Sequence, residues 1–223
     1  QLPYASNPDI GIVGEPGVSP YALSVASYEN EQIRYGNLKL SNDIELPYFD
    51  QTYFGFVLHQ VLDVGTSYEL VYAGEGTDSD LKDVDAEGKV VIVHPSLPYA
   101  SYNYAQFAAE RKGAIALIVV PNKEIDDFPM LNLSPYSLST VSTGKSVGLQ
   151  VIEALENGEQ LTLQVADGVW MDNPHQDELS DFSSIGAPHT LDFKPEISAP
   201  GGSIFSTSAD NDYEVMSGTS MAS

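Results

Sequence analysis

The sequence ends with Ser217-Gly218-Thr219-Ser220-Met221-Ala222-Ser223, where small residues surround one hydroxyl and helix-forming residues follow it. Gly218 allows the backbone to turn tightly and to approach a substrate closely. We expect a helix to begin with Met221 and Ala222, which would put Ser220 at its first turn. Unpaired N–H groups and the positive end of the helix dipole favour developing negative charge there, as acyl transfer requires. A polar turn leading into a terminal helix is the simpler alternative.

A second informative segment precedes this one, and it reads Lys194-Pro195-Glu196-Ile197-Ser198-Ala199-Pro200-Gly201. Together the two segments resemble the nucleophile region of subtilisin-like serine peptidases (subtilases), where K-P-(D/E)-(I/V)-x-A-P-G is followed by a variable stretch and G-T-S-M-A. The resemblance implies that Ser220 is the nucleophile, that Gly218 and Thr219 form its loop, and that the Ser220 backbone N–H is one oxyanion donor. Residues 181–186, Asp-Phe-Ser-Ser-Ile-Gly, resemble the F-S-S-x-G element of the same family.

The partners that such a serine needs are not found in the sequence. In subtilases the catalytic Asp and His and the oxyanion Asn precede the serine in D-(T/S)-G, H-G-T-H and A-A-G-N motifs, and none of these occurs here. The four histidines, His59, His94, His175 and His189, lack this context, and we interpret each as structural or solvated. We therefore expect the chain to be a fragment of a larger parent protein, and we expect the fragment alone to be inactive.

The middle of the chain contains a different pattern. Residues 88–94 and 114–122 read as buried strands on either side of a helix and resemble the protease-associated (PA) domain, with its G-K-V-V-(I/L)-(I/V), helix, G-A-x-A-x-I-(I/V)-x-N pattern. His94-Pro95 stands where many copies carry Arg-Gly. The resemblance implies a small β-rich sandwich or open barrel with two or more helices.

Hydrophobic periodicity predicts the individual elements. Expected strands cover residues 21–28, 37–41, 54–61, 67–72, 88–94, 114–122 and 161–165. One helix is expected over 102–112, with Tyr104, Phe107, Ala108 and Arg111 on its apolar stripe, and another from Thr143, with Val147, Val151 and Leu155 on one face. Gly113 and Gly158 are expected to end these helices, and residues 128–135 to form an extended loop.

These readings give a mixed, strand-rich α/β fold in three segments. Residues 1–40 and 175–223 are the two parts of a subtilisin-like catalytic domain, and residues 41–174 are an inserted PA domain. This arrangement resembles the large cell-envelope peptidases of Gram-positive bacteria, including caseinolytic enzymes and complement-cleaving streptococcal peptidases. It implies a secreted, cell-wall-associated parent with protein or peptide substrates. A non-catalytic protein- or peptide-binding module is the alternative function, and unpaired strands in the flanks predict a homodimer.

Charge and composition narrow the choice of partners. The chain has 9 basic and 32 acidic residues, and its net charge of −23 argues against nucleic acid as a partner. It has no cysteine, and no apolar run reaches the roughly 20 residues that cross a bilayer. We predict no cofactor and no metal site: the acidic loops 78–80, 126–127 and 210–212 lack the pattern of a calcium-binding loop, although calcium in the parent is left open.

Overall fold

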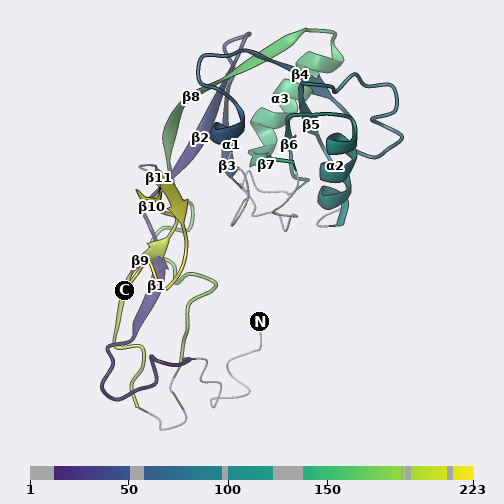
Figure 1. Cartoon of the computed structure of the whole chain (residues 1–223). Coiled ribbons are helices and arrows are strands. Elements are labelled where there is room, and N and C mark those ends of the chain that lie inside the picture. The colour runs from purple at the N-terminus through teal and green to yellow at the C-terminus, as the bar shows by residue number, and fades with distance from the viewer. Residues whose placement is uncertain are drawn as a thin grey trace. The chain divides into compact units, whose positions relative to one another are not determined.

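The computed structural model describes residues 13–50, 58–96, 100–122, 138–186, 188, 192–209 and 213–223. The chain forms two compact units: unit 1 comprises Gln1–Arg34 and Trp170–Ser223, and unit 2 comprises Tyr35–Val169. The chain enters unit 2 within strand β2 (Gln32–Leu40) and leaves it within strand β8 (Leu161–Asp172), as Figure 1 shows. The inserted domain predicted from the sequence covers residues 41–174, whereas unit 2 covers residues 35–169.

Unit 2 is built around a closed barrel of seven strands in the order β2-β3-β7-β6-β5-β4-β8. The other strands are β3 (Glu45–Asp50), β4 (Tyr68–Tyr72), β5 (Val90–Val93), β6 (Ala116–Val119) and β7 (Thr140–Thr143). The run from β4 through β5 and β6 to β7 is parallel, and the pairs β2/β3, β3/β7 and β4/β8 are antiparallel. The strand-rich mixed α/β class is confirmed. The sheet closes, where an open barrel or a sandwich was expected, because the long β8 completes the ring of strands.

The central strands supply side chains to two separate hydrophobic clusters. Val90 and Ile92 of β5 belong to the cluster that contains helix α3 (Lys145–Glu156), and Val91 and Val93 belong to the cluster that contains helix α2 (Ala100–Arg111). Successive residues of a strand point to opposite faces. The two helices therefore cover opposite faces of this part of the sheet (Figure 1). The continuous apolar runs over 88–94 and 114–122 correctly predicted strands buried on both faces.

Helix α2 forms where it was predicted, but it buries a different face. Of the residues expected on the apolar stripe, Ala108 is buried as predicted, but Tyr104 and Phe107 are 72% and 40% exposed, and Ala105, not expected there, is buried. A Cβ atom on Gly76 would lie 2.5 Å from the Cβ of Ala105. At this point the helix packs too closely for a side chain larger than alanine.

The strand predicted over 54–61 is partly wrong, and the helix predicted from Thr143 is found as α3. The strand expected over 54–61 is wrong at its end, because Leu58–Val61 is the short helix α1. Leu58 and Leu62, the residue after the helix, are both buried at helical spacing. Residues 54–57, like the loop predicted over 128–135, lie outside the described residues. Helix α3 buries Val151 as predicted. It ends at Glu156, two residues before Gly158, whose φ of 87° turns the chain away.

Unit 1 contains two small sheets among its described residues. Strand β1 (Val25–Glu29) pairs in parallel with β9 (Ile197–Gly202), and β10 (Ile204–Thr207) pairs antiparallel with β11 (Tyr213–Met216). The strand predicted over 21–28 begins later than expected, and Tyr21 is 98% exposed. In the part of the chain that the structure describes, no helix is long and apolar enough to cross a membrane.

Candidate active site

The parallel pair β1/β9 organises the region around the candidate nucleophile. Val25 pairs with Ile197, Ser27 with Ala199 and Tyr28 with Pro200. Because the strands are parallel, their carboxyl ends meet at one edge, where β9 ends in Gly201 and Gly202. The segment that resembles K-P-(D/E)-(I/V)-x-A-P-G therefore runs along β1 and ends where the nucleophile loop is attached.

The nucleophile loop, residues 217–221, contacts the end of β9 through glycine. The Gly218 N–H donates a hydrogen bond to the Gly201 carbonyl at 2.8 Å. A Cβ atom on Gly201 would lie 2.4 Å from Ser27 Oγ, 2.7 Å from Gly218 O and 3.0 Å from the Cβ of Ala222. Only glycine fits this position without displacing its neighbours, so the loop is held by direct backbone approach.

Ser220 itself lies in a turn rather than in the expected helix. The turn covers Thr219–Met221, and the Met221 N–H donates to Gly218 O at 3.0 Å. The Ser223 hydroxyl donates to Thr219 O at 2.9 Å. The Ser220 side chain is exposed.

A hairpin connects β9 to this loop. Ser203 turns the chain sharply between β9 and β10 with a φ of 56°, a left-handed conformation that residues other than glycine rarely adopt. Its N–H donates to Ser217 Oγ at 2.8 Å. Ile204 pairs with Met216, so the β10/β11 ladder ends directly beside the nucleophile loop. The loop is thus held at Gly218 by β9 and at Ser217 by the start of the hairpin.

Three serines lock strand β1 in place. Ser27, fully buried, shares a hydrogen bond between its hydroxyl and the Ser180 hydroxyl at 2.9 Å, and its N–H donates to Ser183 Oγ at 2.9 Å. The Ser180 N–H donates to Ser27 O at 3.0 Å. The element that resembles F-S-S-x-G therefore packs against β1 and restricts the Ser27 hydroxyl, which faces Gly201.

An ion pair anchors the other end of the same strands. The Lys194 ammonium is buried and donates to the Glu196 carboxylate and to Ala22 O at 2.5 Å. The Ser24 N–H donates to Glu196 Oε2 at 2.8 Å. The hydrogen bond from Lys194, followed by that from the Ser24 N–H, lowers the pKa of Glu196 below its ordinary value of 4.5. The pair fixes β9 against the residues that lead into β1.

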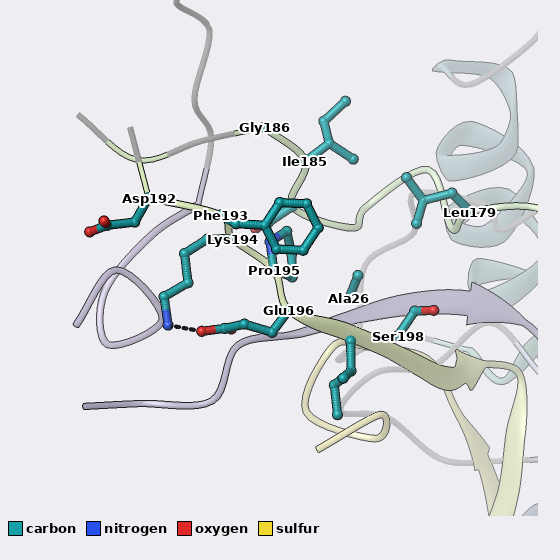
Figure 2. Close-up of a pocket in the computed structure, with 12 residues that line it drawn as sticks. Ala26, Leu179, Ile185, Gly186, Asp192, Phe193, Lys194, Pro195, Glu196 and Ser198 are labelled. Atoms are coloured by element: carbon teal, nitrogen blue, oxygen red, sulfur yellow. Dashed lines mark hydrogen bonds and ion pairs between the residues drawn. The ribbon is translucent and has the colours of Figure 1, made fainter. Parts of the chain in front are cut away.

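A cavity of about 590 Å³ lies beside this ion pair (Figure 2). Apolar side chains of Ala26, Leu179, Ile185, Pro195 and Ile197 line it, together with Asp192, Phe193, Lys194 and Glu196. Residues 217–221 are not among its lining residues. The cavity therefore belongs to the β1/β9 scaffold and not to the immediate surroundings of Ser220.

The structure describes the side chains of two of the four histidines, and one of the three acidic loops. His94 Nδ1 lies 2.9 Å from Val120 O, and His175 Nδ1 lies 3.1 Å from Glu178 Oε2. The side chain of His59 and all of His189 lie outside the described residues, as do the loops 126–127 and 210–212. In the third acidic loop, the Asp80 carboxylate accepts hydrogen bonds from the Thr77 N–H and hydroxyl. Among the described residues, no group of three or more His, Cys, Asp or Glu side chains could hold a metal ion.

The sequence predicts Ser220, Gly218 and Thr219 as site residues, but it does not indicate the residues that hold them. Ser27 and Gly201 face each other from segments far apart in the chain, and no local pattern indicates that contact. The sequence analysis also missed a cluster of four side chains: Arg34, Trp170, Phe205 and Tyr213. The one signal for it in the sequence is Trp170, which is the single tryptophan of the chain.

The structure thus places the exposed Ser220 on a glycine-bound turn at the end of a parallel strand pair. The chain belongs to the subtilase family, whose sequence model matches residues 5–223. It is 32% identical over 246 residues to the PI-type proteinase of Lactococcus lactis subsp. cremoris, covering 96% of this chain and 12% of that protein. It is 28% identical over 232 residues to the C5a peptidase of Streptococcus pyogenes serotype M3 (strain ATCC BAA-595 / MGAS315), covering all of this chain and 18% of that protein.

The chain therefore spans less than a fifth of the length of these curated relatives. Among solved structures, an aminopeptidase from Aneurinibacillus sp. strain AM-1 matches 68% of this chain and 42% of its own, with 19% identity and a TM-score of 0.41. The subtilisin-like protease Apa1 from an Antarctic Pseudoalteromonas matches 93% of this chain and 47% of its own, with 14% identity and a TM-score of 0.36. With TM-scores below 0.5, neither similarity bears on fold or function.

Proposed function

We propose that this chain carries the nucleophile of a larger serine endopeptidase of the subtilisin type, and that Ser220 is that nucleophile. The observation that carries the proposal is the exposed turn of Ser220, bound to the end of β9 by the 2.8 Å hydrogen bond between Gly218 and Gly201. Membership of the subtilase family supports it, because the match includes this loop.

In the proposed reaction, Ser220 Oγ forms a bond to the carbon of a peptide carbonyl. Its proton passes to a histidine contributed by a part of the parent outside this chain, and an aspartate there orients that histidine. Negative charge develops on the carbonyl oxygen, and the Ser220 backbone N–H is one donor to it. The histidine then protonates the leaving amine, and water releases the acyl group in a second step. Because the sequence lacks the motifs that supply this Asp and His, we propose that the fragment alone does not hydrolyse peptides.

We further propose that unit 2 is a PA-type insertion that modulates substrate access. Unit 2 is continuous in sequence and has its own closed barrel and hydrophobic clusters, which supports a role separate from the chemical step. The same observation supports the alternative function, in which unit 2 binds a protein or peptide without any catalytic role of this chain. Deleting unit 2, residues 35–169, from the parent separates the two: the first proposal predicts altered substrate choice with retained labelling of Ser220, and the alternative predicts no labelling.

The parent is proposed to be extracellular, associated with the cell wall, and to act on protein or peptide substrates. The relatives' names, proteinase and peptidase, support the substrate class. The order of motifs, which resembles that of cell-envelope peptidases, supports the location.

The test uses the parent protein and a fluorophosphonate probe, which reacts with activated serines. We expect Ser220 to be labelled, and we expect Ser220→Ala to abolish both labelling and peptide hydrolysis. Ser206→Ala, which removes an exposed serine hydroxyl from β10 of the same unit, is the matched control and should react as the wild type does. Labelling and hydrolysis that persist in Ser220→Ala would overturn the proposal.

A further inference from the structure

Four side chains of unit 1 form a continuous stack that the proposed chemistry does not use. The Trp170 and Phe205 rings meet edge to face, with centroids 5.7 Å apart and an interplanar angle of 88°. Phe205 stacks on Tyr213 at 5.3 Å and 23°. The Arg34 guanidinium carbon lies 4.7 Å from the Phe205 ring centroid and 5.9 Å from that of Trp170. Both kinds of contact are attractive at these distances.

Two members of this stack belong to the two strands through which the chain enters and leaves unit 2. Arg34 belongs to β2 and Trp170 to β8, and each is the unit 1 residue at which the chain changes unit. The two strands are tied together nearby, because Gln32 Nε2 donates to Asp172 Oδ1 at 3.1 Å and the Asn173 N–H donates to Glu31 O at 2.8 Å. Arg34 and Trp170 are therefore presented by a hydrogen-bonded pair of strands.

The other two members of the stack belong to the β10/β11 hairpin, which leads to the nucleophile loop. Phe205 belongs to β10 and Tyr213 to β11. Phe205 pairs with Val215 and Thr207 with Tyr213, so the two stacked rings are diagonal neighbours across the ladder. β11 runs directly into Ser217, whose hydroxyl accepts the Ser203 N–H, and then into Gly218 and Ser220.

The stack is more exposed than a core cluster would be. Trp170 is 50% exposed and Tyr213 is 56% exposed. Rings left this open contribute less burial than a core residue of the same size, so global stability alone does not account for four side chains arranged in series. What they do is connect two structural elements, the paired strands β2/β8 and the hairpin β10/β11.

We propose that Trp170 is a positioning residue for Ser220. Through its contact with Phe205 it holds the β10/β11 hairpin, and the hairpin holds the nucleophile loop at Ser217. This inference rests on the proposed function, since it concerns the reactivity of the same serine.

The experiment measures the rate at which a fluorophosphonate labels Ser220 in the parent, well below its unfolding temperature. Trp170→Ala removes the edge-to-face and cation–π contacts, and it should slow labelling about tenfold. Trp170→Phe keeps an aromatic ring against Phe205 and should restore most of the rate. Tyr21→Ala, which truncates a 98% exposed aromatic side chain of the same unit, is the matched control and should label at the wild-type rate.

Two further measurements separate positioning from general destabilisation. With a short peptide substrate, Trp170→Ala should lower kcat and leave KM close to the wild-type value, because the stack acts through the loop. Should Trp170→Ala fail to fold, Tyr213→Ala tests the exposed end of the stack and should slow labelling about threefold.

Each outcome is decisive for one proposal. A wild-type parent that is not labelled at Ser220 would refute the proposed function itself. A wild-type parent that is labelled, together with folded Trp170→Ala and Tyr213→Ala variants that react at the wild-type rate, would overturn only the positioning role. A rise in KM with unchanged kcat would also overturn it, because it would place Trp170 in substrate binding.

Discussion

Replacing Gly201 by alanine tests how the nucleophile loop is held. The new Cβ would lie 2.4 Å from Ser27 Oγ and 2.7 Å from Gly218 O, whereas ordinary carbon contacts are about 3.5 Å or longer. Something must move by about 1 Å. Ser27 is fully buried and held by Ser180 and Ser183, so the displacement falls on Gly218 and therefore on Ser220.

The expected cost has two parts. Overpacking of this kind destabilises by about 1–3 kcal/mol, and misplacing a reacting group by about 1 Å lowers the rate on the order of 100-fold. The assay is fluorophosphonate labelling of Ser220 in the parent, with thermal unfolding followed in parallel. Gly14→Ala is the control, since no atom lies within 4 Å of the Cβ position there, and it should behave as the wild type. A folded Gly201→Ala variant that labels at the wild-type rate would refute this account of the loop.

Three further predictions concern the scaffold. Ile118→Ala, in the fully buried core of unit 2, should cost about 2–5 kcal/mol, measured by native-state hydrogen exchange of the β5 and β6 amides; unchanged exchange would contradict the packing described. Arg111→Ala removes an exposed ion pair with Asp78 and should change the same measurement by less than about 1 kcal/mol; a larger loss would show that the pair is not merely a surface contact. Because Lys194 lowers the pKa of Glu196 below 4.5, the ionised carboxylate contributes stability above that pH and loses it as the pH falls through the lowered pKa. Glu196→Gln should therefore flatten the acid side of the stability profile, measured by thermal unfolding at several pH values, and an unchanged acid limb would argue against the ion pair's role.

The strands and helices of unit 2 were predictable where one local signal was strong. β5 and β6 are short, continuous apolar runs, and α3 has its apolar residues at helical spacing. The buried face of α2 was not predictable in the same way. The spacing of the large apolar residues Tyr104 and Phe107 suggested that they face the core, whereas Ala105 is the residue that fits the close approach at Gly76. Large apolar side chains indicate burial only where the neighbouring element leaves room for them.

The sequence predicts the candidate nucleophile loop, but it does not predict the residues that hold this loop in place. Ser220 could be proposed as the nucleophile because its motif is contiguous in the sequence. The strands β3, β7, β10 and β11 were not predicted. β7 pairs with the distant strands β3 and β6, which no local pattern indicates, whereas β10 and β11 form a local hairpin that was missed. The contacts of Gly201 with Ser27 and of Trp170 with Phe205 join residues far apart in the chain, and a single sequence gives no measure of such proximity.

The closure of the seven-stranded sheet limits how unit 2 can recognise another molecule. Each strand of that ring has a hydrogen-bonded neighbour on both sides, so a bound peptide has no open edge along which to add itself as an extra strand. Any ligand of unit 2 must be read by side chains and connecting loops. Pairing of backbones between two protein molecules is left, among the described strands, to the short sheets of unit 1.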